Sequence, residues 1–282
     1  MQTERRDGDD AAVARMLWAA SLKSLRVYTR YRFNAVMSFL NVIAWLPSLY
    51  FLGRSFGPDG RIAGLATYTG TGDYASFLIA GWVLASYVVA AYWGMGLSLF
   101  EEMIGGTLEA NWLTPAPRWV IVVGQSMRTF VTTTISVAVV LVLARLLLHV
   151  PFDPGAWRAL WVLLPAVAGL YGVGFAAAAL TLVVKDPAEI IDMLSYGTSV
   201  FSGDRFPVAA LPEPLLVLSL AFPLTYAFDG LRHAAIGTIP LVPFRLEVTI
   251  VVGFLIASAL LSSAAFRLAD RRVRRLGTLS HH

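Results

Sequence analysis

The chain lacks cysteine altogether and has few charged residues, and each shortage excludes classes of protein. Without cysteine there can be no disulfide, no thiolate metal site and no cysteine nucleophile. Only 14% of the 282 residues are Asp, Glu, Lys or Arg, whereas 57% belong to the hydrophobic set, and the mean hydropathy is +0.67. Soluble domains carry about 25% charged residues. The composition therefore indicates an integral membrane protein with no sizeable soluble domain.

Lysine is the scarcest cation, and its positions exclude a P-loop. That motif needs a glycine-rich turn leading into Lys and then Ser or Thr, so that backbone amides and an ammonium group hold phosphates. Lys23 and Lys185 are the only lysines, and no glycine run precedes Lys23-Ser24. The chain lacks this route to ATP hydrolysis, and we expect no catalytic residue, metal site or bound cofactor in it.

Apolar tracts long enough to cross about 30 Å of hydrocarbon recur along the chain. We predict five full-length spans, over residues 33–56, 76–100, 120–148, 157–184 and 248–266. The tract 188–201 reaches only about 21 Å at 1.5 Å per residue, and we count it as the fifth of six crossings. Four prolines cut the following segment, about 205–236, into pieces that fit short re-entrant helices shielded by protein. The predicted fold class is an all-α polytopic membrane protein with six transmembrane helices, the domain running from 33 to 275.

Basic residues concentrate at the two ends, with seven before the first span and five from Arg267 onward. Short cytoplasmic segments hold such an excess, so both termini are predicted to be cytoplasmic. Residues 1–10 are predicted to be disordered, and 11–32 to form an interfacial amphipathic helix with Lys23, Arg26 and Arg30 toward inner-leaflet lipids. A basic flank that only anchors the first span is the alternative. We expect no nucleic acid partner, and we set the tail 276–282 apart because its closing histidines resemble a tag remnant.

The stretch "EEMIGGTLEANWLTPAPRW", residues 101–119, separates the second and third spans on the predicted cytoplasmic side. Gly105 and Gly106 break the helix that leaves the membrane, Thr107 can cap a new one, and Pro115 and Pro117 stop it. The pattern predicts a short amphipathic helix, over about 101–116, that docks a protein with a basic groove. A capped turn with solvated acids is the alternative.

The pattern "GTLEANWLTPAPRW" resembles the coupling helix of bacterial ABC-2 type transporter permeases. The interfacial N-terminal helix, the six-span layout and "SGDRFPVAALPEPLLVLSLAFPLTYAFDGLR" are similar to the same family, in which Phe-Pro, Leu-Pro, Pro-Leu-Thr-Tyr and Leu-Arg follow in this order. The resemblance covers about residues 11–275 and, within the family, lies nearest the drug and lipid export branch.

The resemblance implies a permease subunit in the bacterial cytoplasmic membrane that pairs with a second six-span subunit as a homodimer or heterodimer. A separate ABC ATPase would bind ATP and Mg²⁺. The residues implied to contact that ATPase are Glu101, Glu102, Thr107, Leu108, Glu109, Trp112, Thr114 and Pro115. The residues implied to form the outer gate are Arg205, Phe206, Pro207, Pro212, Pro223, Tyr226 and Arg232.

Polar and aromatic residues within the first two spans are candidates for lining a transport pathway. They are Asn41, Tyr87, Tyr92 and Trp93. Such groups also pack helices against one another in lipid, so both roles stay open.

The expected function is ATP-driven export of an amphiphilic drug, antibiotic or lipid-like molecule by alternating access. A permease for a lipid-linked polysaccharide or teichoic-acid-type glycan is the alternative, and stacked aromatic residues along the pathway would favour it. A distant alternative is an intramembrane serine hydrolase built on Ser98 with His149 or His233. The predicted topology puts Ser98 at the cytoplasmic end and both histidines near the outer face, too far apart for proton transfer.

Overall fold

The computed structural model describes residues 13–23, 61–106, 117–181 and 187–276, with Val184 and scattered positions between 25 and 55. Every regular element in these ranges is a helix, and the one strand-like feature among them is an antiparallel bridge between Arg61 and Asp73. The predicted all-α class therefore agrees with the described part of the chain.

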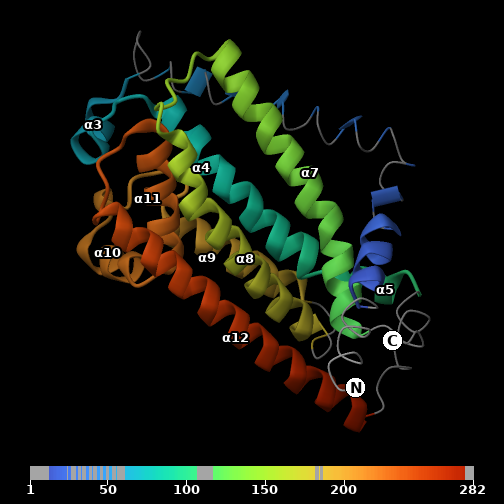
Figure 1. Ribbon diagram of the computed structural model, residues 1–282. Coiled ribbons are helices and arrows are strands. Elements are labelled where there is room, and N and C mark those ends of the chain that lie inside the picture. The colour runs from blue at the N-terminus through green and yellow to red at the C-terminus, as the bar shows by residue number, and fades with distance from the viewer. Residues whose placement is uncertain are drawn as a thin grey trace, which may run out of the picture.

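Four helical stretches in the described residues are long and apolar enough to cross a membrane, and a bent helix pair makes a fifth if it is one span. The stretches are Tyr74–Ile104, Trp119–Leu147, Ala156–Ala179 and Phe244–Leu268. They contain α4 (Tyr74–Val89), α7 (Arg118–Leu147), α8 (Leu160–Thr181, after the short η2, Ala156–Ala159) and the first part of α12 (Phe244–Leu276). These helices run side by side (Figure 1). They match four of the five predicted full-length spans, whereas the predicted first span, 33–56, lies largely outside the described residues.

The second predicted span is interrupted, although its sequence suggests one continuous helix. After α4 the chain forms a π-helix, η1 (Ala90–Met95), and then α5 (Ser98–Ile104). The amide of Gly96 donates to the carbonyl of Ala91 at 3.2 Å, which closes the wider turn. A side chain at Gly96 would collide with the Tyr92 carbonyl. Single π turns inside membrane helices often mark functional sites.

Helices α8 and α12 make the most extensive packing in the bundle, and glycine permits it. A Cβ added at Gly169 would lie 2.6 Å from the Phe254 ring, and one at Gly172 would lie 2.8 Å from Ser258 Oγ. Small residues let backbones approach closely, which is how helices associate in lipid. Gly169 and Gly172, in the fourth predicted span, therefore lie on a packing surface.

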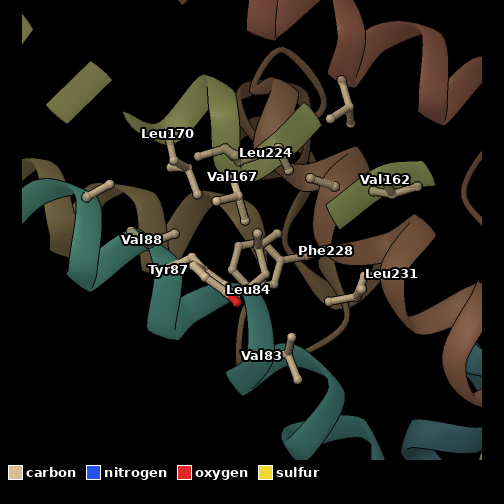
Figure 2. Packing of buried hydrophobic residues seen from close by; sticks show 14 of the residues in the cluster. Val83, Leu84, Tyr87, Val88, Val162, Val167, Leu170, Leu224, Phe228 and Leu231 are labelled. Atoms are coloured by element: carbon tan, nitrogen blue, oxygen red, sulfur yellow. The ribbon is translucent and has the colours of Figure 1, made fainter. Parts of the chain in front are cut away.

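The largest buried cluster lies where α11 (Pro223–Ile236) meets α4 and α8. Phe228, which is 1% exposed, points into the space between Leu84 and Tyr87 of α4 and Val167 of α8 (Figure 2). This contact fixes α11 against two of the long helices. It positions the residues of α11 that the sequence singled out.

Short helices gather at one end of the bundle. They are α3 (Ala63–Thr69), η3 (Val208–Ala210), α10 (Glu213–Leu220) and α11. The helix over residues 13–23, α5 and the last turns of α12 lie at the opposite end (Figure 1). Helices α10 and α11 meet at 87°, and α9 (Ala188–Ser202) leads from the long helices toward them.

Candidate functional site

A groove of about 630 Å³ runs between α4 with η1 on one side and α9 on the other. Aromatic side chains line it, from Tyr74 and Trp82 of α4, Trp93 of η1 and Tyr196 of α9. Ser48 and Leu52, from the predicted first span, also line the groove. The site is thus built by three of the segments that the sequence assigns to the membrane.

One face of α9 gives the groove its polar character. Asp192, Ser195 and Ser199 follow i, i+3 and i+7 spacing, which places them on one face of a helix, and all three line the groove. Met193 and Tyr196 are 79% and 70% exposed, so α9 also presents apolar surface. An arrangement of hydroxyl and carboxylate groups among indole rings suits a molecule with both polar and apolar parts.

Two hydrogen bonds hold the helices around this groove. The hydroxyls of Tyr92 and Thr198 lie 3.1 Å apart and join η1 to α9, while those of Tyr87 and Thr134 lie 3.0 Å apart and join α4 to α7. Of the predicted lining residues, Trp93 lines the groove, Tyr92 is buried beside it and Tyr87 lines a cleft next to α7. Asn41 lies outside the described residues.

The groove ends at a cluster built around Arg232 of α11, which is 3% exposed. Its guanidinium donates to the backbone carbonyl of Phe77 at 3.3 Å, to that of Gly203 at 2.7 Å and to that of Asp204. The Phe77 ring lies 3.7 Å from the guanidinium carbon, and the carboxylates of Asp204 and Asp229 supply opposite charge. One side chain therefore ties α11 to α4 and to the loop that follows α9.

The loop after α9 carries the exposed cation of this region. Arg205 pairs with Asp204 at 3.7 Å, and its side chain is 76% exposed. Ser199 of α9 donates to the same carboxylate at 2.7 Å, and the Tyr74 hydroxyl donates to the Arg205 carbonyl at 3.4 Å. Both Asp204 and Arg205 line the groove.

Prolines shape the α10–α11 pair, because each stands where a helix begins. Pro207 and Pro212 precede η3 and α10, and Pro223 is the first residue of α11, a position that tolerates a missing amide. Thr225 donates to the carbonyl of Ser219 at 2.6 Å, and Tyr226 to that of Leu220 at 2.8 Å, which fixes the bend.

Two acidic residues at the other end of the bundle attach α5 to α7. Glu102 is 9% exposed and accepts a hydrogen bond from Gln125. Glu101 pairs with Arg128 at 3.8 Å, and the Glu101 side chain is 60% exposed. Both carboxylates thus contact α7, but Glu102 is buried against it and Glu101 is largely exposed.

A comparison with family models matches residues 15–236 to the ABC-2 type transporter model. The chain belongs to the ABC-2 type transporter family. It is therefore a permease subunit of an ABC transporter, and this membership implies an ABC ATPase subunit as its partner. A comparison with curated proteins found no match.

The predicted outer-gate residues of this ABC-2 permease meet at one end of the bundle, around Arg232 and the α10–α11 bend. Of the predicted ATPase contacts, Glu101 and Glu102 lie at the opposite end (Figure 1). The other six fall on residues 107–116, outside the described residues. Lys23, Arg26 and Arg30 have exposed side chains.

The serine that the hydrolase alternative would need is engaged with its own helix in the ABC-2 permease. Ser98 is 2% exposed and donates to the Met95 carbonyl at 2.7 Å. His233 lies on α11, and His149 follows α7, at the end of the bundle opposite α5 (Figure 1). Neither histidine can act as a base for Ser98 over that separation.

Sequence reasoning missed several groove residues, among them Trp82, Thr198 and the polar face of α9. A signal for that face was present, because Asp192, Ser195 and Ser199 share one side of an otherwise apolar helix. Polar residues within membrane helices tend to face cavities or partners rather than lipid.

Proposed function

We propose that this ABC-2 permease exports an amphiphilic molecule by alternating access, driven by a separate ATPase, and that the cargo passes along the groove between α4 and α9. The observation that carries the proposal is the groove itself, with indole and phenol rings on one side and Asp192, Ser195 and Ser199 on the other. Such a lining offers apolar contact and hydrogen bonds within membrane depth.

The α10–α11 bend is proposed as the outer gate. Its elements are too short to span the membrane. α11 packs against α4 and α8, and α10 packs against α9 and α11, so other helices cover parts of both elements, as re-entrant segments require. The Arg232 cluster holds this bend against the groove's end. In the proposed mechanism, Arg205 lies at the mouth and meets cargo there, because its side chain is exposed while its backbone is held by Tyr74.

The opposite end is proposed as the ATPase-coupling surface and as cytoplasmic, with both termini on that side. Glu101 and Glu102 fasten α5 to α7, so a displacement of the predicted coupling segment 101–116 would move α5 and α7 together. The implied contacts Thr107, Leu108, Glu109, Trp112, Thr114 and Pro115 remain part of this proposal. We further propose six spans, a paired second subunit and inner-leaflet lipid contacts for Lys23, Arg26 and Arg30.

Single-cysteine labelling tests the pathway, because the chain has no native cysteine. Ser199→Cys places a thiol in the groove, whereas Arg245→Cys places one at an exposed position in the first turn of α12, outside the groove. A membrane-impermeant maleimide is applied from outside to membranes that contain the complex, with and without ATP and vanadate.

We expect nucleotide to change the labelling rate at position 199 several-fold, and a transported amphiphile to protect that thiol. The rate at position 245 is expected to stay constant. Equal rates at position 199 in all conditions would remove the groove from the transport pathway.

A lipid-linked glycan is the second candidate cargo, and one observation favours it. The groove carries five aromatic side chains, and sugars stack on aromatic rings. Stimulation of ATPase activity separates the two candidate cargoes. If the cargo is a drug-like amphiphile, such a compound should stimulate the ATPase activity of the complex. If the cargo is a lipid-linked glycan, only a lipid-linked oligosaccharide should do so.

A further inference from the structure

A second cleft, of about 1000 Å³, lies between α7, α8 and α12, on the other side of α4 from the groove. Its walls are almost entirely apolar, with Trp119, Phe130 and Leu141 from α7, Leu163 and Tyr171 from α8, and Phe266 from α12. It has a volume at the upper end of ordinary ligand pockets, about 300–1,000 Å³. Unlike the groove, it has no carboxylate among the described residues that line it.

The cleft has the length and the openness of a site for a lipid chain. Trp119 and Leu141 are 22 positions apart on one helix, which corresponds to about 33 Å at 1.5 Å per residue. Only 17% of the residues in the apolar parts of α7 and α12 are buried inside the protein, so most of their apolar side chains are open to the surroundings of the chain. Ala138 and Ala168 line the cleft with exposed, small side chains, which leave space between the helices.

One end of the cleft carries its charge. Arg267, on α12, is exposed and lines the cleft at the end where Trp119 lies in the first turn of α7. Its guanidinium donates to the carbonyl of Ser263 at 3.0 Å and to the Ser263 hydroxyl at 3.2 Å. These bonds use two of the five N–H donors of arginine and orient the rest. Tryptophan and arginine are the residues that mark a membrane interface, and a guanidinium suits a phosphate.

We infer that this cleft binds one anionic phospholipid, with an acyl chain between α7 and α8 and the phosphate on Arg267. A cation at one end of a long apolar cleft is complementary to a molecule with one anionic head and an apolar tail. The lipid comes from the leaflet at the C-terminal end of α12, which is the cytoplasmic leaflet in the orientation proposed above. The site is separate from the transport groove, and its occupancy depends neither on ATP nor on cargo.

Native mass spectrometry of the detergent-purified transporter tests this inference without a transport assay. The complex is stripped of lipid and titrated with phosphatidylglycerol, and separately with phosphatidylcholine. Arg267→Gln removes the cation, and Arg245→Gln is its matched control, because Arg245 is exposed at the other end of α12. Ala168→Trp fills the cleft, and Ala257→Trp adds the same bulk on an exposed face of α12 outside it.

We expect the wild type to retain one phosphatidylglycerol per chain more tightly than phosphatidylcholine. Arg267→Gln should weaken phosphatidylglycerol about fivefold, the effect of one interfacial cation, and leave phosphatidylcholine unchanged. Ala168→Trp should abolish retention of both lipids, and the two controls should behave as wild type.

Equal retention of phosphatidylglycerol by wild type, Arg267→Gln and Ala168→Trp would overturn the inference. The inference would also be overturned if Ala168→Trp released a second copy of the chain or the transported molecule from the cleft instead of lipid. Loss of ATPase stimulation with lipid retention intact would instead count against the proposed function alone.

Discussion

The Arg232 cluster gives the sharpest prediction about stability, because one buried side chain holds three parts of the chain. Arg232→Met keeps the length and apolar bulk of the side chain but removes its donors. The carbonyls of Phe77, Gly203 and Asp204 then lose their partner. A buried acceptor without a donor costs about 1–3 kcal/mol, whereas hydrogen bonds between membrane helices average about 0.6 kcal/mol.

Three acceptors at about 1 kcal/mol each give an expected loss of about 3 kcal/mol. The lost contact with the Phe77 ring adds to this cost. Part of the cost is offset because methionine, unlike Arg232, does not have to bury a charge. At roughly 2–4 °C per kcal/mol for a large domain, the midpoint of thermal unfolding should fall by about 6–12 °C.

The assay is heat-induced unfolding of the purified protein in mild detergent, followed by intrinsic fluorescence and by loss of the monodisperse peak. Arg205→Met is the control, because the Arg205 side chain is 76% exposed and pairs only at 3.7 Å. Its midpoint should stay within about 2 °C of wild type, as surface substitutions do. Equal midpoints for Arg232→Met and wild type would refute the reasoning that the guanidinium holds the α10–α11 end of the bundle together.

Three further predictions concern coupling, the outer mouth and helix packing. Glu109→Lys should leave the protein folded in the membrane but abolish co-purification of the ATPase; unchanged ATPase-driven export would count against the coupling assignment. Arg205→Glu should reduce export at least tenfold without weakening ATPase binding, and lost ATPase binding would remove Arg205 from the outer mouth. Gly172→Ala should lower the free energy of unfolding by about 1–3 kcal/mol, because its Cβ would lie 2.8 Å from Ser258 Oγ. Gly253→Ala is the matched control, since nothing lies within 4 Å of its Cβ, and a similar loss there would contradict the packing argument.

Hydropathy alone predicts most of the long helices, because a span is specified by an uninterrupted apolar run and little else. The bounds of α7 agree with the predicted third span to within a few residues. The bounds of the apolar part of α12, Phe244–Leu268, agree as closely with the predicted last span. The basic tail that follows the last predicted span continues α12 to Leu276. Polar flanks that extend a helix into water leave no hydropathy signal.

The sequence could not predict how the α10–α11 end of the bundle is held. Arg232 stood out through its resemblance to a family motif, yet its hydrogen bonds join positions 28, 29 and 155 residues away. The acceptors are backbone carbonyls, which every residue has, so no residue type marks them. Gly81 is a partial exception, because a Cβ there would collide with the Arg232 guanidinium.

The π turn of η1 was also beyond prediction. "AAYWGM" contains no residue that distinguishes a π-helix from an α-helix. The hydroxyls of Tyr92, in this turn, and of Thr198, on α9, lie 3.1 Å apart although the two residues are 106 positions apart in the chain. Sequence alone does not show such a contact.

The central claim is that this ABC-2 permease works with a separate ATPase, and purification tests it most directly. The chain is extracted gently from its native membrane, and the proteins that co-purify are quantified by mass spectrometry. We predict a P-loop ATPase at a one-to-one ratio with the permease, lost on Glu109→Lys. A permease that purifies without any ATPase, while remaining folded and monodisperse, would contradict the account.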